Sequence, residues 1–217
     1  MSYPTLIGFA STHYNSVSSV TLACPSGNAG DLLVAFSGDI TADGTTSSSG
    51  WTTVNFGSWV YPKLYWKIAT ASSESIVCNF TSYAYAEQWT YVYRFRGTHP
   101  TAPISLTGKV NNSTVISPSA VIPYAESKIL FSSGYAGDVT PAISNANLTN
   151  VTANSSGPYR TSDGDSGWTD SYQRSVMADI IGTPTFSSIT GTHMNCFVVI
   201  RPAPSISNNN LFFGSNF

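Results

Sequence analysis

Residues 163–170 carry the densest group of side chains that could do chemistry. Three carboxylates are spaced as Asp163-x-Asp165-x-Gly167-x-x-Asp170. A calcium loop requires oxygen ligands at alternating positions and a glycine that allows a sharp bend. Here the glycine comes one place early for a helix-loop-helix site, and the bidentate glutamate expected further along is missing. The alternatives are an irregular calcium site on Asp163, Asp165 and Asp170 and a solvated turn. We favour the turn and expect no cofactor.

The same residues contain Gly164-Asp165-Ser166-Gly167, a string that also surrounds the nucleophilic serine of trypsin-like proteases. Such a serine needs a histidine base, an aspartate that orients the histidine, and backbone N–H groups as the oxyanion hole. Trp168 stands where the next glycine should be, and no Ala-His-Cys-like segment is present. The acidic residues form no marked pair for glycoside hydrolysis either. The sequence therefore predicts a protein without a catalytic centre.

Aromatic residues near predicted loop ends are the remaining candidates for a binding site. A protein that binds sugars can stack them on the faces of Trp or Tyr rings, whose polar tips also form hydrogen bonds. The positions that could do this are Trp51, Trp168, Tyr83 and Tyr85. The alternative, which we favour for any one of them, is that the rings seal sheet edges or contacts between subunits.

The composition narrows the class of protein and of partner. Of the 217 residues 41% are hydrophobic but only 9% are charged, against about 25% in an average soluble domain. Ser, Thr and Asn take the place of charged residues, so the surface is expected to carry mainly hydroxyl and amide groups. Copies with such a surface repel one another weakly, which suits proteins packed into assemblies. The net charge of −2 and the lack of a basic run argue against nucleic acid as a partner. No apolar stretch approaches the roughly 20 residues of a membrane helix.

The first residues and the cysteines indicate the compartment in which the protein is made. The first residues, MSYP, have neither a basic nor an apolar region, so we expect no signal peptide and synthesis in the cytoplasm of a host. Three widely spaced cysteines do not suggest a disulfide framework. Cys78 alternates with Ile76 and Phe80 and is therefore predicted to be a buried core residue.

Hydrophobic residues alternate with a period of two almost throughout, which predicts antiparallel strands. In residues 88–96 the rings of Trp89, Tyr91, Tyr93 and Phe95 are predicted to form the inner face of a half-buried strand. Thr90, Val92, Arg94 and Arg96 are predicted to point the other way. In residues 61–70, Lys63, Tyr65 and Lys67 are predicted to point outward. Residues 31–37 contain the continuous apolar run 32–36, as expected of a central strand covered on both faces. Further strands are predicted at 5–10, 19–23, 51–56, 75–81, 104–110, 128–135, 176–181 and 195–201.

Roughly ten strands separated by turns, without helices, predict an all-β, antiparallel two-sheet sandwich of the jelly-roll type at residues 1–204. Two segments stand apart from it. Residues 140–168 are polar and long enough to form a functional loop. Residues 205–217 end in four apolar side chains, Leu211, Phe212, Phe213 and Phe217, which cannot build a core alone. They could form a strand on the same sandwich, a frayed end, or an arm that docks on a partner subunit.

Five short motifs follow one another in an order that resembles a protein family. They are GDLLVAF (residues 30–36), Gly50-Trp51, LYWKIAT (64–70), FRGTHPTAPIS (95–105) and FVVIRPAP (197–204). Together they resemble the jelly-roll or lectin-like β-sandwich domains of tailed-phage virion proteins, over residues 5–204. The resemblance implies a structural protein of a bacteriophage particle, located in the virion as a capsid decoration, fibre or tail appendage. It carries over no catalytic residues.

The resemblance also implies partners. Phage sandwiches of this kind work as trimers or other symmetric homo-oligomers in contact with other virion proteins, and shared arms lock them together. The segment 205–217 would serve as such an arm. The alternative function is a carbohydrate-binding module or receptor-binding fibre tip that recognises a host surface glycan during attachment.

Overall fold

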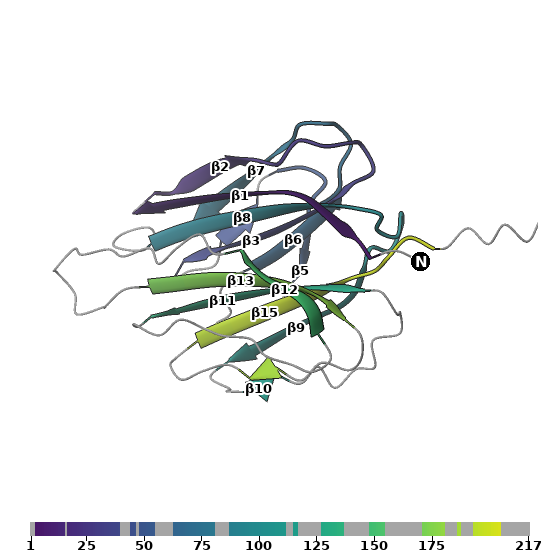
Figure 1. Cartoon of the computed structure of the whole chain (residues 1–217). Coiled ribbons are helices and arrows are strands. Elements are labelled where there is room, and N and C mark those ends of the chain that lie inside the picture. Colours follow the sequence, from purple (N-terminus) through teal and green to yellow (C-terminus); the bar gives the residue numbers. More distant parts are fainter. Residues whose placement is uncertain are drawn as a thin grey trace, which may run out of the picture.

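All regular structure that is described consists of antiparallel β-strands (Figure 1). The computed structural model describes residues 3–15, 17–39, 44–46, 48–54, 63–80, 87–111, 115–116, 127–136, 148–154, 171–180, 186–187 and 193–204. This part of the chain contains no helix, so none that could cross a membrane, and the predicted all-β class is confirmed. The strands are β1 Thr5–Asn15, β2 Ser19–Ala23, β3 Leu32–Asp39, β4 Gly44–Thr46, β5 Thr52–Val54, β6 Lys63–Ile68, β7 Ser75–Phe80, β8 Glu87–Arg96, β9 Ile104–Asn111, β10 Val115–Ile116, β11 Lys128–Ala136, β12 Leu148–Asn154, β13 Ser171–Ile180, β14 Phe186–Ser187 and β15 His193–Ile200.

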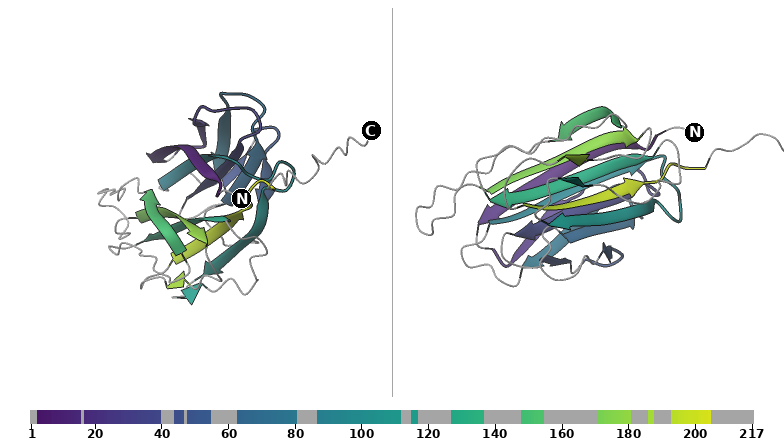
Figure 2. Two further views of the ribbon diagram at one scale, coloured as in Figure 1. Left: turned by 45° about the vertical axis from the view of Figure 1, so that its right-hand side comes forward. Right: turned by 90° about the horizontal axis from the view of Figure 1, so that it is seen from below.

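Three sheets form the layers. The main sheet has the order β1-β8-β3-β6-β5, and the second sheet has the order β12-β13-β11-β15-β9. These two five-stranded sheets lie face to face (Figure 2). A small sheet of order β2-β7-β4 covers the other face of the main sheet, and β10 pairs with β14. The third layer was not predicted from the sequence.

The central strand β3 is buried on both faces, as its continuous apolar sequence predicted. Every side chain from Leu32 to Phe36 is 0% exposed. Successive side chains of a strand point to opposite faces, so Leu32, Val34 and Phe36 belong to one core cluster and Leu33 and Ala35 to the other. The main sheet is thus the middle layer of the described fold.

The first core lies between the main and second sheets and is rich in aromatic rings. Tyr91, Tyr93 and Phe95 of β8 pack there with Val198 and Ile200 of β15. The ring of Tyr93 lies 6.2 Å from that of Phe95 in a stacked arrangement, a geometry that contributes about 0.5–1.5 kcal/mol beyond simple burial. The inward face predicted for these three residues is confirmed.

The second core lies between the main sheet and the small sheet. Ile76, Cys78 and Phe80 of β7 point into it and are at most 4% exposed. The predicted buried position of Cys78 is therefore confirmed. Tyr65 of β6 and Val92 of β8 meet them from the main sheet.

Several sequence predictions were wrong because a face of the main sheet that was expected to be solvated is covered by the small sheet and by the loops at residues 24–31 and 69–74. Tyr65 was predicted to point outward but is 0% exposed, and Lys63 is also buried. Strand β8 was predicted to be half-buried, yet Val92 and Arg94 on its second face are both 0% exposed. Alternation identifies the two faces of a strand, but it does not reveal that a third layer covers the more polar one.

Two strands lie where no strand was predicted. Strand β4 lies between the predicted strands 31–37 and 51–56, and β12 lies within the polar segment 140–168. Both strands consist mainly of Thr, Gly and Asn and sit at sheet edges, where hydrophobic alternation is not required. The rest of segment 140–168 lies outside the described residues.

Candidate functional site

Most of the predicted contact residues lie outside the part of the chain that is described. These are the calcium candidates Asp163, Asp165 and Asp170, the aromatic candidates Trp168, Tyr83 and Tyr85, and the tail residues Leu211, Phe212, Phe213 and Phe217. Trp51 is described and lies directly before β5. No group of three metal-binding side chains occurs among the described residues.

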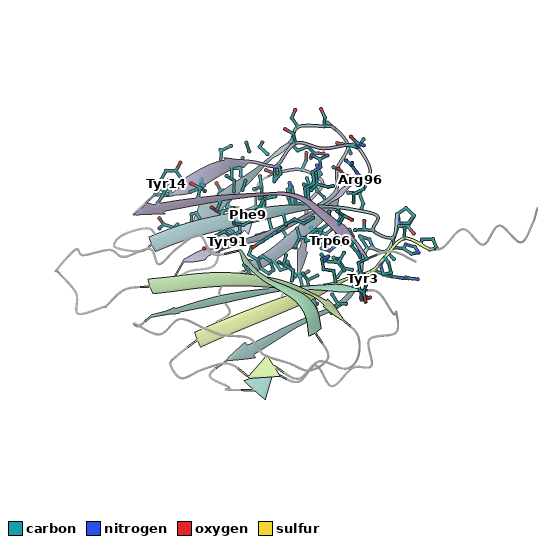
Figure 3. All side chains as sticks on the ribbon, in the orientation of Figure 1. Tyr3, Phe9, Tyr14, Trp66, Tyr91 and Arg96 are labelled. Atoms are coloured by element: carbon teal, nitrogen blue, oxygen red, sulfur yellow. The ribbon has the colours of Figure 1, made fainter. Side chains whose placement is uncertain are left out.

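The ion pairs between described residues lie at one end of the main sheet, which we call the charged end. It consists of Asp31, Lys67, Glu74, Arg94 and Arg96, together with the loops at residues 24–31 and 69–74. Strand pairing brings these residues together, because β3 begins beside the end of β6 and the end of β8. Figure 3 shows Arg96 at this end and Tyr14 at the opposite end of the sheet.

Arg94 is the centre of the charged end and is 0% exposed. Its Nε donates to Oδ2 of Asp31 at 2.9 Å. Its Nη1 donates to the carbonyl oxygens of Pro25 and Ser72, both at 2.8 Å. Its Nη2 donates to the carbonyl oxygens of Asn28 at 2.6 Å and Ala71 at 2.9 Å. All five N–H groups of the guanidinium therefore have acceptors.

Asp31 joins this buried cation to a second arginine. Arg96 donates from Nε to Oδ1 of Asp31 at 2.9 Å and from Nη2 to Oδ2 at 3.1 Å. The backbone N–H of Asn28 adds a bond of 2.7 Å to Oδ2. The carboxylate is 3% exposed, whereas the Arg96 side chain is 46% exposed. One carboxylate is thus shared by a fully buried and a solvated guanidinium.

A glycine makes room for this arrangement. A Cβ atom on Gly27 would lie 2.3 Å from Nε of Arg94 and 2.5 Å from Oδ2 of Asp31. Real Cβ contacts are not this short, so any other residue would displace the ion pair. The turn at residues 25–28 therefore covers the buried guanidinium.

A second ion pair adjoins the first. Lys67 of β6 pairs with Glu74, whose Oε1 also accepts from the backbone N–H groups of Thr70 and Ala71. The Lys67 ammonium lies 6.0 Å from the centroid of the Trp51 ring, within range of a cation–π contact. The indole is partly exposed, but its Nε1 is buried and has no hydrogen-bond partner within the described part of the chain.

The electrostatics of the charged end fix both carboxylates in the ionised form. Burial acts to raise the pKa of Asp31, but the hydrogen bonds from Arg96, Asn28 and Arg94 outweigh it, so the pKa lies below its ordinary value. The pKa of Glu74 is lowered in the same way, with Lys67 as the main donor acting against burial. A carboxylate held ionised and saturated with donors is a poor general acid or base at neutral pH.

The charged end also holds the place where the chain leaves the second sheet. The loop that follows β8 runs beside residues 201–204, and Thr98 forms an isolated bridge with Pro202. The N–H of Ala203 donates to the carbonyl of Gly97 at 2.7 Å, and the N–H of Arg201 donates to the carbonyl of Pro103 at 2.7 Å. Two of the sequence motifs, FRGTHPTAPIS and FVVIRPAP, therefore pair with each other.

His99 belongs to this loop and is the histidine whose side chain is described. Its Nδ1 accepts from the backbone N–H groups of Ala102 at 3.1 Å and Thr101 at 3.4 Å. The ring therefore shapes the loop, and its contacts are with backbone rather than with a nucleophile or carboxylate. The described side chains offer no pair of catalytic groups.

Sequence reasoning missed the buried pair of Arg94 and Asp31. Arg94 was assigned to an outward face with Arg96, and Asp31 was placed at the start of the predicted central strand without a partner. Two signals could have found the pair. Strand β8 ends in Arg-x-Arg after a stretch whose only other charged residue is Glu87, and Asp31 directly precedes the apolar run Leu32–Phe36.

No protein-family model, curated protein or solved structure matches this chain.

Proposed function

We propose that the chain is a non-enzymatic structural component of a bacteriophage particle. In this proposal residues 1–204 form a jelly-roll-type sandwich that serves as a capsid decoration, fibre or tail appendage in the virion. Copies assemble into a trimer or another symmetric homo-oligomer through the C-terminal arm 205–217, in contact with other virion proteins.

The observation that carries the proposal is the fixed exit of the arm. Residues 201–204 are held by backbone hydrogen bonds to the loop after β8, and that loop is continuous with Arg96 of the charged end. The apolar side chains of the arm therefore start from a rigid point rather than from a loose terminus. A fixed origin limits the directions in which the arm can leave, which reduces part of the entropy cost of docking on a neighbouring subunit.

The distribution of charge supports assembly as well. Arg96 is the one exposed residue among the charged residues whose side chains are described, and Asp31, Lys63, Arg94 and Lys128 are buried. A surface with few charges gives weak electrostatic repulsion between copies. Such a surface favours the packing of many copies side by side on a particle.

The proposal has a test in solution. Light scattering during size-exclusion chromatography of the full chain should give a symmetric oligomer. A variant with Phe212 and Phe213 both changed to Ser should shift to smaller species with an unchanged melting temperature. The matched control changes Asn208 and Asn209 to Ser and should keep the oligomer. A monomeric wild-type chain that is also absent, by mass spectrometry, from phage particles purified from its host would refute the proposal.

One observation favours a second candidate, a carbohydrate-binding module or receptor-binding tip. Trp51 is partly exposed beside Lys67, which pairs with Glu74, and the neighbouring residues Thr52 and Thr53 are exposed. A ring face next to polar groups is the combination that stacks on a sugar and bonds to its hydroxyls. A glycan array with the wild type and the Trp51→Ala variant tests this, and a wild type silent across the array would remove the candidate.

A further inference from the structure

The long edge strand β1 has pairing capacity that the described fold does not use. In the main sheet β1 pairs with β8 over ten positions on one side, and no described strand lies on its other side. An edge strand presents a row of N–H and C=O groups that can pair with another chain. Strand β1 is 11 residues long, longer than any other edge strand among the described residues.

The usual protection of an edge is largely missing on β1. Proteins protect edges with short strands, charged residues, proline or bulges. The opposite edge of the main sheet, β5, is only three residues long, and the edge strand β9 contains Lys109. The sequence of β1, TLIGFASTHYN, contains no Asp, Glu, Lys, Arg or Pro. Its one irregularity lies between Leu6 and Gly8 and leaves the following seven residues in regular register.

Strand β1 also carries the last ring, Phe9, of a row of aromatic side chains that runs across the main sheet to its edge. The Phe9 ring lies 4.8 Å from the ring of Tyr93 and 5.8 Å from that of Tyr91. Phe9 is only partly buried, although it packs against the first core. Near the far end of the same strand Tyr14 is 46% exposed. An added strand with apolar side chains would extend this row and cover Phe9.

Residues 205–217 have the composition of such a strand. They contain no charged side chain, so their burial against β1 requires no desolvation of a charge. In an extended strand Leu211 and Phe213 lie on one face and Phe212 on the other. The segment therefore offers two apolar side chains to the core side of an edge.

The reach of the arm identifies the copy from which the strand comes. Arg96 pairs with Thr5, and Ala203 bonds to the adjacent Gly97, so the arm leaves beside the start of β1. Every described strand pair is antiparallel, and antiparallel pairing is slightly the more stable kind. To pair in that direction with its own β1, the arm would first have to run the length of the strand.

That length is about 36 Å for the 11 residues of β1. Thirteen residues span at most about 45 Å when fully extended, which leaves two or three residues for pairing. From these distances we infer that the arm of a neighbouring copy adds, as an antiparallel strand, to the edge of β1 that no described strand pairs with. This inference rests on the proposed assembly through residues 205–217 and identifies the surface that receives the arm.

The test is cross-linking in the full chain. Thr12 on β1 and Asn210 in the arm are both changed to Cys, and a bismaleimide with a spacer of about 10 Å is added to the purified protein. The matched control combines Asn210→Cys with Thr53→Cys, on the exposed opposite edge of the same sheet. Wild type and the Thr12→Cys single variant give the background. We expect covalent dimers or longer chains at least tenfold above the control and the background.

Each other result has a definite meaning. Cross-links within single chains would mean that the arm folds back on its own β1, and dimers of the single variant would mean that two β1 strands pair. Both outcomes, or a yield equal to the control, would overturn the inference. Hydrogen exchange on the wild-type oligomer is a second test that needs no variant. If the inference holds, the backbone amides of β1 that point away from β8 should exchange as slowly as those that pair with β8. The particle analysis is independent, so cross-links without virion association would contradict only the proposed function.

Discussion

Replacing Arg94 with Met removes the buried guanidinium while keeping an unbranched side chain of similar length. The change deletes the ion pair with Asp31 and leaves the carbonyl oxygens of Pro25, Asn28, Ala71 and Ser72 without their donor. Breaking a buried ion pair by removing one partner costs about 3–5 kcal/mol. The loss is reduced because Asp31 still pairs with Arg96. It is increased because the four carbonyl oxygens lose their donor, and buried acceptors without a donor are costly. We therefore expect a loss of about 4 kcal/mol in the free energy of unfolding.

The chain supplies a matched control in Arg96→Met. Both arginines bond to the same carboxylate, but the Arg96 side chain is 46% exposed, and pairs in water contribute about 0–1 kcal/mol. Urea unfolding followed by tryptophan fluorescence compares the two variants. With a slope of about 2.5 kcal/mol/M, the midpoint should fall by roughly 1.6 M for Arg94→Met and by at most about 0.4 M for Arg96→Met.

A second variant keeps this prediction testable if Arg94→Met does not fold. Arg94→Lys retains the charge but has only three donors for the five acceptors, so its loss should lie between those of the two Met variants. Midpoints of Arg94→Met and Arg96→Met that agree within 0.4 M, about 1 kcal/mol at that slope, would refute the view that the buried cation holds the two loops together.

Three further predictions concern the same region. Gly27→Ala should lower the unfolding free energy by about 2–4 kcal/mol, because its Cβ would displace Arg94 and Asp31; a midpoint equal to that of the wild type would contradict the close contact. The lowered pKa values of Asp31 and Glu74 mean that their stabilisation is complete above the ordinary values of 3.8 and 4.5 and is lost as the pH falls through the lower folded-state values. Urea midpoints should be constant from pH 6 to 8 and fall below about pH 4.5, and the Asp31→Asn variant should show a smaller fall. Burial raises the pKa of Cys24 to about 11, so maleimide at pH 8 should label this thiol at least tenfold more slowly in the native than in the unfolded chain; equal rates would show that it is accessible.

Strands were predictable from the sequence wherever their alternating hydrophobic residues form the buried face. Strand β2 was predicted at its observed bounds, β7 within one residue and β3 within two. Strands β4 and β12 were not, because Thr- and Asn-rich edge strands gain stability from backbone pairing rather than from a hydrophobic face. The third layer could not be read locally, since the small sheet that buries Tyr65 is assembled from segments distant in the sequence.

The candidate site was less predictable than the fold. Arg94 looked like a solvated residue because strand alternation placed it beside Arg96, and the two share a face but differ completely in exposure. What buries Arg94 is the carbonyl cage of the loops at residues 25–28 and 71–72, and carbonyl groups carry no residue-type signal. Of the aromatic candidates, Trp51 was placed at a loop end, and its contact with Lys67 arises from pairing of β5 with β6.

The use of charge inside the fold connects stability with the proposed assembly. Hydrophobic strands can pack by burial alone, but the loops at residues 24–31 and 69–74 present carbonyl groups that need donors, and Arg94 supplies them from within the sheet. Charges placed there cannot also repel other copies at the surface, and β1 is left with an uncharged edge. A free protein at high concentration would aggregate through such an edge. In the proposed assembly the same edge would receive the strand of a neighbouring subunit, so the low charge and a β1 edge that no described strand pairs with would both serve that assembly.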